Sequence, residues 1–246
     1  MNNRLNILGV GVDTYNMKEA TQFLMSAVDT EGMTSVSTPN SEIILHAYKN
    51  PDYRDVLNRA GLITPDGIGV VYASKILGRP MSERVSGFDL ACELLKKSAP
   101  LGKTLYLFGG KPGVAERAAE KIKKLYPGIV ILGVSDGYFD EEKEKKIIED
   151  INQKKPDILF VCLGFPKQEC WIDAHSDLNV HVAMGIGGSL DVFAGEVKRA
   201  PEFYQKHGLE WFYRLIKQPS RFVRMLALPK FGFTVLLHGR KFLKQR

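Results

Sequence analysis

Several short polar stretches in the first half of the sequence carry residues that could bind a substrate. They offer the carboxylate of Asp66, the neutral polar groups of Thr38 and Asn40, and the guanidinium of Arg84. Side chains of these types suit a polar acceptor that carries an anionic group. A structural reading is also open, because Pro65-Asp66-Gly67 is a common turn sequence and Asn40 could cap the helix that follows.

Two glycine-bearing loops, 164–169 and 185–191, distinguish the second half. Backbone N–H groups that glycine exposes at helix N-termini suit a diphosphate. Asp191 could accept hydrogen bonds from ribose hydroxyls, and Tyr138 could stack on a base. The candidate nucleotide-binding residues are Tyr138, Gly164, Lys167, Gly187, Gly188 and Asp191. Neither glycine cluster fits G-x-G-x-x-G or a P-loop, so these glycines could instead serve tight turns and close contacts.

Other chemistries find little support in the sequence. The five His residues show no metal-ligand spacing, and the three Cys residues form no C-x-x-C. No G-x-S-x-G motif occurs, which argues against a hydrolase of that type. A D-x-D pair, which many sugar-nucleotide enzymes use to hold a divalent metal, is also absent. We therefore expect no metal and no resident cofactor, and any nucleotide-sugar chemistry should be metal-independent.

The elements that must position these residues alternate between short apolar runs and amphipathic stretches. The expected strands are Leu5–Val12, Met33–Ser37, Gly61–Thr64, Thr104–Phe108, Ile129–Val134, Ile158–Leu163 and Val180–Met184. The expected helices are Lys18–Val28, Ser41–Lys49, Gly67–Leu77, Phe88–Ser98, Val114–Leu125, Glu141–Gln153 and Gln168–His175. This alternation predicts an α/β fold with a mostly parallel, Rossmann-like sheet and helices on both faces. Ligands then bind at the carboxyl ends of the strands, where the polar loops fall.

The pattern changes in the last fifth of the chain. Residues 198–246 hold 12 Lys+Arg and 2 Asp+Glu, a net charge of +10, whereas residues 1–197 have a net charge of −4. We therefore divide the chain into an α/β core, 1–197, and a basic, aromatic, helical appendage, 198–246. The expected helices of the appendage are Glu210–Lys217, Ser220–Ala227 and Phe231–Lys244, with Pro219 and Pro229 as interruptions.

Such a charge asymmetry predicts an anionic partner, either a membrane surface or nucleic acid. The aromatic and aliphatic residues among the basic ones favour insertion into a membrane interface over base recognition. No apolar run reaches the roughly 18 residues that a spanning helix needs, and no signal peptide is visible. We expect a peripheral protein on the cytoplasmic face of the cell membrane. A module that binds nucleic acid remains the alternative from another class.

Five motifs in order along the chain, with two more in the appendage, resemble those of the WecG/TagA/CpsF glycosyltransferase family, and most closely its TagA branch. The motifs are Thr38-Pro39-Asn40, Pro65-Asp66-Gly67, Arg84-Val85-Ser86-Gly87-Phe88-Asp89, Gly164-Phe165-Pro166-Lys167-Gln168-Glu169, Gly187-Gly188-Ser189-Leu190-Asp191-Val192-Phe193-Ala194-Gly195, Arg199-Ala200-Pro201 and Gly208-Leu209-Glu210-Trp211. The likeness covers nearly the whole chain. An NAD-dependent oxidoreductase fits the alternation of elements but lacks its fingerprint.

The resemblance implies an inverting, metal-independent transfer of N-acetylmannosamine. The donor would be UDP-ManNAc and the acceptor the C4 hydroxyl of GlcNAc on undecaprenyl diphosphate, in wall teichoic acid synthesis. A related transferase that uses another UDP-sugar, such as UDP-ManNAcA, is the alternative within the family. A homo-oligomer would be in keeping with the family.

The resemblance also implies roles for particular residues. Asp66 would match the catalytic base, and the glycines Gly187 and Gly188 would lie at the UDP site with Asp191. The family's pocket residues would be Thr38, Asn40, Arg84 and Gln168. Three arginines of the appendage, Arg214, Arg221 and Arg224, would complete the site over the diphosphate. Without a metal, stabilising the leaving group would depend on Arg, Gln and backbone N–H groups.

Overall fold

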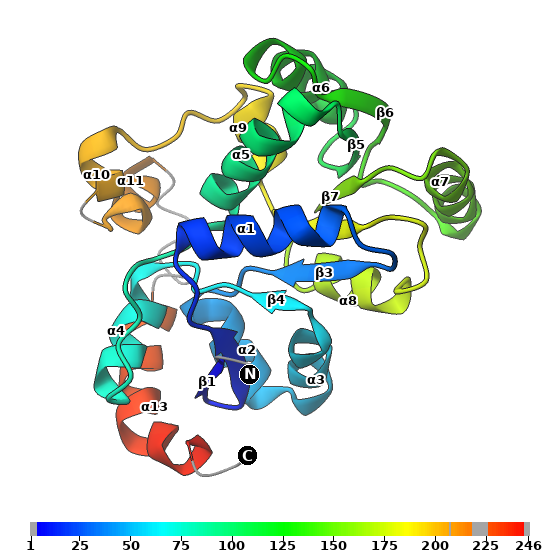
Figure 1. Ribbon diagram of the computed structural model, residues 1–246. Coiled ribbons are helices and arrows are strands. Elements are labelled where there is room, and N and C mark those ends of the chain that lie inside the picture. Colours follow the sequence, from blue (N-terminus) through cyan, green and yellow to red (C-terminus); the bar gives the residue numbers. More distant parts are fainter. Residues whose placement is uncertain (1–3, 207, 218–225, 244–246) are drawn as a thin grey trace.

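A six-stranded parallel sheet forms the centre of the molecule, with strands in the order β4-β3-β8-β7-β5-β6 (Figure 1). The computed structural model describes residues 4–206, 208–217 and 226–243. The strands of the sheet are β3 (Thr34–Ser37), β4 (Leu62–Ile63), β5 (Thr104–Gly109), β6 (Val130–Ser135), β7 (Ile158–Cys162) and β8 (Val182–Gly185). The predicted α/β class and parallel sheet are confirmed.

Helices cover both faces of this sheet, as the buried side chains of β5 illustrate. Leu105 and Leu107 belong to one apolar cluster, whereas Tyr106 and Phe108 belong to another, because successive side chains of a strand point to opposite faces. The first face is covered by α1 (Met17–Val28), α5 (Gly87–Ser98), α6 (Val114–Leu125) and α9 (Ser189–Phe193). The second face is covered by α7 (Glu141–Lys154) and α8 (Lys167–Ala174). A single 3₁₀ turn, Ala99–Leu101, follows α5.

The segment predicted as one strand, Leu5–Val12, is a two-stranded antiparallel hairpin that lies outside the main sheet. Its strands are β1 (Arg4–Ile7) and β2 (Val10–Asp13). Leu8 and Gly9 form the turn, with φ of 53° and 95°. The single-strand prediction was wrong because the apolar run continues through the turn and conceals it.

The hairpin packs with three helices into a third apolar cluster, beside the sheet. These helices are α2 (Ser41–Lys49), α3 (Pro51–Arg59) and α4 (Ile68–Ile76). The sequence analysis missed α3. Pro51 occupies its first turn, where a proline needs no backbone N–H partner, so this proline begins a helix.

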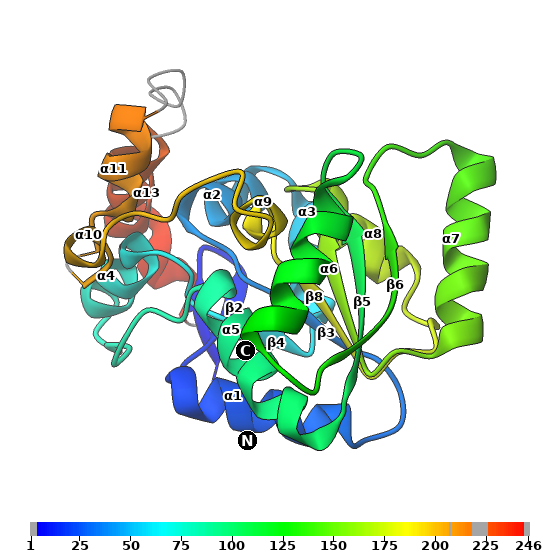
Figure 2. The same ribbon diagram turned by 90° about the horizontal axis from the view of Figure 1, so that it is seen from above.

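Within its described residues, the C-terminal segment contributes α10 (Glu202–Lys206), α11 (Glu210–Lys217) and α13 (Ala227–Phe242). Figure 2 shows α11, α13 and α4 at the end of the molecule away from α7. The helix predicted at 210–217 is confirmed, and that predicted at 220–227 lies almost wholly outside the described residues. The last helix starts at Ala227 rather than Phe231, because Pro229 lies within its first turn and does not break it.

The last helix is anchored in the cluster around the hairpin. Phe231 and Val235 are each 1% exposed and pack with buried residues of β1, α2 and α4. The proposed boundary at residue 197 stays a prediction, but α13 shares its apolar core with the N-terminal elements. In the part of the chain that is described, every helix is too short or too polar to cross a bilayer.

Candidate active site

The carboxyl ends of the six parallel strands bring the predicted site residues to one edge of the sheet, as expected for this fold. Loops after β3 and β4 carry Thr38, Asn40 and Asp66. Loops after β6, β7 and β8 carry Tyr138, Gly164 and the 187–191 segment. The predicted acceptor residues and the predicted nucleotide residues therefore lie at the same edge, on different strands.

Asp66 lies in the loop between β4 and α4 and is half-buried. Its backbone N–H donates to the Thr64 carbonyl at 3.0 Å. The backbone N–H of Gly87 donates to Asp66 Oδ2 at 3.5 Å, and Val85 N–H donates to the Pro65 carbonyl at 3.1 Å. The loop around Val85 is thereby fastened directly to the loop that carries the candidate base.

Thr38 and Asn40, in the loop after β3, lie next to the Asp66 loop and the loop around Val85. A Cβ added to Gly87 would lie 2.8 Å from Thr38 Oγ1, so only glycine allows this close approach. Asn40 Oδ1 accepts hydrogen bonds from the N–H groups of Glu42 and Ile43 at 2.9 and 3.1 Å. The capping interpretation of Asn40 is confirmed, and its Nδ2 group is the part that the cap does not use.

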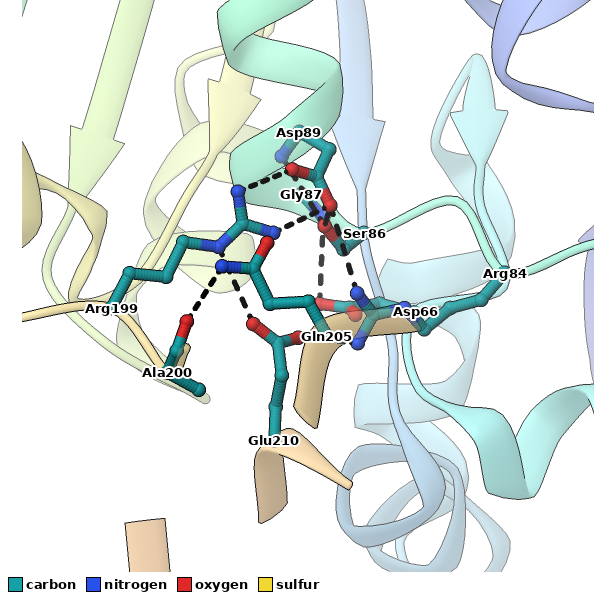
Figure 3. Close-up of polar contacts among 9 residues, drawn as sticks. All are labelled: Asp66, Arg84, Ser86, Gly87, Asp89, Arg199, Ala200, Gln205 and Glu210. Atoms are coloured by element: carbon teal, nitrogen blue, oxygen red, sulfur yellow. Dashed lines mark hydrogen bonds and ion pairs between the residues drawn. The ribbon is translucent and has the colours of Figure 1, made fainter. Parts of the chain in front are cut away.

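Arg84 belongs to a cluster of two arginines and two acids, which we call the arginine–acid cluster: Arg84, Asp89, Arg199 and Glu210 (Figure 3). Arg84 Nη1 donates to Glu210 Oε2 at 2.5 Å, and Arg84 Nη2 lies 3.6 Å from Asp89 Oδ2. Arg199 pairs with Asp89 at 2.7 Å and with Glu210 at 3.3 Å. Both arginines therefore share the same two carboxylates.

The surroundings of Asp89 keep its carboxylate ionised. Burial alone would raise the pKa of Asp89, but hydrogen bonds from Arg199 and Ser86 outweigh burial and lower it. Ser86 also accepts from the Asp89 N–H at 3.2 Å and caps α5. The guanidinium of Arg199 lies over the ring of Phe88 at 4.9 Å. The start of α5 is thus fixed on the C-terminal segment by charge, capping and a cation–π contact.

The arginine–acid cluster is the part of the site that sequence reasoning missed. Only Arg84 had been assigned to the pocket, and the structure shows it paired with Glu210 on α11, 126 residues away in the sequence. Asp89, Arg199 and Glu210 do lie within stretches that carry the family resemblance, which was the available signal. The role of Arg84 toward a substrate stays a prediction.

A cleft of about 550 Å³ lies over the ends of β5, β6 and β7. Three of the predicted nucleotide residues, Tyr138, Lys167 and Asp191, line it. Tyr138 is 62% exposed, so its ring is available to a ligand. Cys162 also lines the cleft, and burial raises the pKa of its thiol, which keeps it neutral.

The walls of this cleft are loops bound to one another through their backbones. Gly110 N–H donates to the Cys162 carbonyl at 3.1 Å, and Gly137 N–H donates to the Gly110 carbonyl at 2.8 Å. Asp136 accepts from the Tyr138 N–H at 2.8 Å and from Lys143 at 2.9 Å. Burial alone would raise the pKa of Asp136, but these hydrogen bonds have the larger effect and lower it. Tyr138 therefore sits on a loop with a defined backbone.

Gln168 acts on the glycine loop after β8. Its side chain is 4% exposed, and its Oε1 accepts from the Gly187 N–H at 3.0 Å. Its Nε2 donates to Glu169 Oε1 at 2.9 Å, which fixes the orientation of the amide. Burial raises the pKa of Glu169 and of its neighbour Tyr53. Gln168 thus shapes the 186–188 loop, and its contact with a substrate stays a prediction.

The remaining predicted residues differ in how far the structure describes them. Gly164 and Gly187 have φ of 74° and 52°, and a Cβ at either would meet nothing within 4 Å. Gly188 precedes α9, where an added Cβ would lie 3.6 Å from Asp191 Oδ2. Arg214 lies on α11, whereas Arg221 and Arg224 lie outside the described residues. Among the described residues, no three His, Cys, Asp or Glu side chains are grouped as a metal site would require.

The parallel α/β fold gathers polar loops at one edge of its sheet, and comparison with known proteins gives the family. The chain belongs to the glycosyl transferase WecG/TagA/CpsF family, whose model matches residues 5–245. The predicted family and enzyme class are thereby confirmed.

Curated relatives share one name, N-acetylglucosaminyldiphosphoundecaprenol N-acetyl-beta-D-mannosaminyltransferase. The protein from Bacillus spizizenii (strain ATCC 23059 / NRRL B-14472 / W23) is 44% identical over 206 residues, which cover 83% of this chain and 79% of the relative. That from Staphylococcus aureus (strain MW2) is 35% identical over 246 residues, which cover 99% of this chain and 96% of the relative.

Proposed function

We propose that this protein transfers N-acetylmannosamine from UDP-ManNAc to the C4 hydroxyl of GlcNAc on undecaprenyl diphosphate, with inversion and without a metal. The observation that supports this most is the common sheet edge shared by Asp66 and the cleft of Tyr138, Lys167 and Asp191. The names of relatives that match up to 99% of the chain supply the sugar and the lipid.

In this mechanism Asp66 takes the proton of the acceptor hydroxyl as that oxygen attacks the anomeric carbon. The C–O bond to UDP breaks on the opposite face, which inverts the configuration. An aspartate carboxylate is a weak base, so its position against the hydroxyl matters most. The Gly87 N–H and the Thr64 carbonyl hold the Asp66 loop for this task.

Negative charge develops on the departing UDP and must be stabilised. Lys167 at the cleft and the backbone N–H of Gly188 are the proposed donors to the diphosphate, since the Gly187 N–H already donates to Gln168. Tyr138 stacks on the uracil, and Asp191 binds the ribose hydroxyls. The family resemblance adds Arg214, Arg221 and Arg224 of the C-terminal segment as further cations for the diphosphate.

The acceptor lipid implies that the protein works as a peripheral protein at the cytoplasmic leaflet. Residues 198–246 carry a net charge of +10, which anionic lipids attract. Exposed apolar side chains on α11 and α13 add insertion into the interface, among them Phe212, Ile216, Phe233, Leu236 and Leu237. A basic segment without exposed apolar side chains would favour binding to nucleic acid. The exposed apolar side chains of this segment favour binding to a membrane.

A panel assay tests the proposal. The full chain is incubated with UDP-ManNAc, UDP-GlcNAc and UDP-ManNAcA, each with a GlcNAc-diphospholipid, and UDP release and the product's linkage are measured. We expect UDP release with UDP-ManNAc that depends on the acceptor, and a β1→4 disaccharide in the product. Faster transfer from UDP-ManNAcA would assign the related activity of the same family. No acceptor-dependent UDP release with any donor would overturn the proposal.

A further inference from the structure

An apolar groove of about 350 Å³ lies where α4 meets the C-terminal segment. Its walls come from α4, α11 and α13, with Ile68, Ile76, Leu209, Leu228 and Phe231 among the lining residues. None of the described residues that line it carries a charge. Its volume lies within the range of roughly 300–1,000 Å³ that is usual for small-molecule sites.

One end of the groove lies close to the polar site. Ile68 lines the groove and lies two residues after Asp66, which puts their Cα atoms within about 7.6 Å of each other. Leu209 also lines it and precedes Glu210 of the arginine–acid cluster. A Cβ at Gly208 would lie 3.3 Å from Ile68 Cβ, so the two walls touch at this end. The apolar groove therefore has one end near the candidate base and the arginine–acid cluster.

Further apolar side chains are exposed around the groove. Tyr72 and Ile76 on α4 are 56% and 38% exposed, and Ile216 on α11 is 54% exposed. Figure 2 shows these helices together at one end of the molecule. The site is thus polar at one end and apolar along its length, and it opens among apolar side chains. Such a site fits a molecule with a charged head and a hydrocarbon chain.

We propose that this groove binds the hydrocarbon of the acceptor, namely the isoprene units next to its diphosphate, and so directs the sugar end toward Asp66. This inference rests on the proposed function, which supplies a polyprenyl diphosphate as acceptor. A second protein chain fits the groove less well, because a stable interface takes about 20–30 residues a side and eleven residues line this groove.

Gly232 offers a way to fill the groove. It lines the groove from α13, and an added Cβ would meet no heavy atom within 4 Å. The series Gly232→Ala, Gly232→Leu and Gly232→Phe therefore introduces graded bulk without displacing Asp66 or the arginine–acid cluster. Leu125→Phe is the matched control, since Leu125 is 64% exposed at the end of α6 and does not line the groove.

Binding of farnesyl diphosphate to the full chain, measured by equilibrium dialysis, is the first readout. We expect Gly232→Phe to weaken binding by at least about tenfold, which corresponds to about 1.4 kcal/mol, Gly232→Leu to have an intermediate effect and Leu125→Phe none. The KM for a polyprenyl-linked GlcNAc acceptor should rise in the same order, with binding of UDP unchanged. Equal farnesyl diphosphate binding by all variants would overturn the inference, as would a change confined to oligomeric state.

A photoreactive prenyl diphosphate keeps the test valid if the bulky variants do not fold. With the unaltered chain, a benzophenone-bearing analogue should crosslink within α4, α11 or α13, and excess farnesyl diphosphate should compete. Crosslinks confined to other elements would overturn the groove assignment. Neither binding readout requires turnover. Prenyl binding in the absence of any sugar transfer would therefore contradict the proposed function and leave the groove intact.

Discussion

The two sides of the sheet edge are built in different ways. On the donor side, the loops after β5, β6 and β7 are bound to each other through backbone groups, such as Gly137 N–H to the Gly110 carbonyl at 2.8 Å. On the acceptor side, side chains far apart in the sequence make the contacts, and Arg84 with Glu210 is the clearest case. Backbone contacts depend only on the sheet, whereas the acceptor side also depends on how α11 docks.

We call the donor side the prebuilt half, because backbone contacts among its own loops form it. We call the acceptor side the assembled half, because it also needs contacts with α11. The described residues that line the donor cleft end at Asp191, before the C-terminal segment begins. The acceptor side gains Glu210 from α11 and the apolar groove from α13. Variants on the donor side should therefore affect donor binding alone, and variants on the acceptor side should affect turnover, acceptor binding and membrane binding together.

The largest effect is expected for Asp66→Asn, which removes the proton acceptor while keeping the side chain's shape. Turnover should fall by roughly 10²–10⁴-fold, because general-base catalysis contributes about that much. Binding of UDP, measured by calorimetry, should not change, since Asp66 lies on the acceptor side. Asp177→Asn, at an exposed position, is the control. Near-normal turnover of Asp66→Asn would make Asp66 a turn residue only.

Membrane binding should be the next largest effect on the assembled half. Phe233, Leu236 and Leu237 are 68%, 59% and 73% exposed on α13, at spacings that put them on one face. Replacing all three by Gln should weaken binding to anionic liposomes by roughly 10–100-fold, or about 1.4–2.8 kcal/mol in total, which corresponds to partial insertion of side chains that would each contribute about 1.5–3 kcal/mol if fully buried.

Two comparisons make the liposome experiment decisive. Leu125→Gln removes an equally exposed apolar side chain from α6 and should sediment with liposomes as the unaltered chain does. Binding should also fall with rising salt, because the basic residues of 198–246 contribute through screened charges. If the triple variant binds liposomes normally but loses affinity for single-stranded DNA, the segment is a nucleic-acid module instead.

Glu210→Gln tests whether the arginine–acid cluster couples α11 to the Asp66 loop. Glu210 and Arg84 have side chains only 11% and 17% exposed, so loss of this carboxylate leaves both arginines with one acid. We expect kcat/KM for the acceptor to fall by about tenfold, with a lower Tm and faster proteolysis of the C-terminal segment. Glu202→Gln removes the segment's other, exposed acid and should have a smaller effect. Unchanged kinetics for Glu210→Gln would show that the two halves assemble independently.

The sequence predicted the prebuilt half better than the assembled one, for a physical reason. The strands β5, β7 and β8 are buried on both faces, so they read as continuous apolar runs, and the loops that follow them could be located. The same rule failed at Leu5–Val12, where a turn at Leu8 interrupts an apolar run. The Arg84–Glu210 pair depends on how α11 docks, and no local pattern encodes a contact across 126 residues.

A smaller effect, limited to the donor, is expected for Asp191→Asn. Asp191 lines the nucleotide cleft, and a hydrogen bond to a charged group contributes about 1.5–3 kcal/mol, so the KM for the UDP-sugar should rise by about tenfold. The KM for the lipid acceptor and liposome binding should stay constant, since neither depends on this cleft. A rise in the acceptor's KM with unchanged donor binding would reverse the assignment of the two sides.

The smallest effect should come from removing divalent metals. The described residues include no cluster of His, Cys, Asp and Glu side chains that could hold one, and the sequence has no D-x-D pair. In the proposed mechanism, Lys167, the Gly188 N–H and the arginines stabilise the leaving diphosphate by charge and hydrogen bonds. Excess EDTA should change the initial rate by less than about twofold, whereas losing a catalytic metal would remove several kcal/mol of stabilisation. UDP should be measured chromatographically, because coupling enzymes often need Mg²⁺ themselves. A rate that collapses with EDTA and recovers with Mg²⁺ or Mn²⁺ would mean that donor and acceptor sides share a metal, and that the donor cleft is incomplete without it.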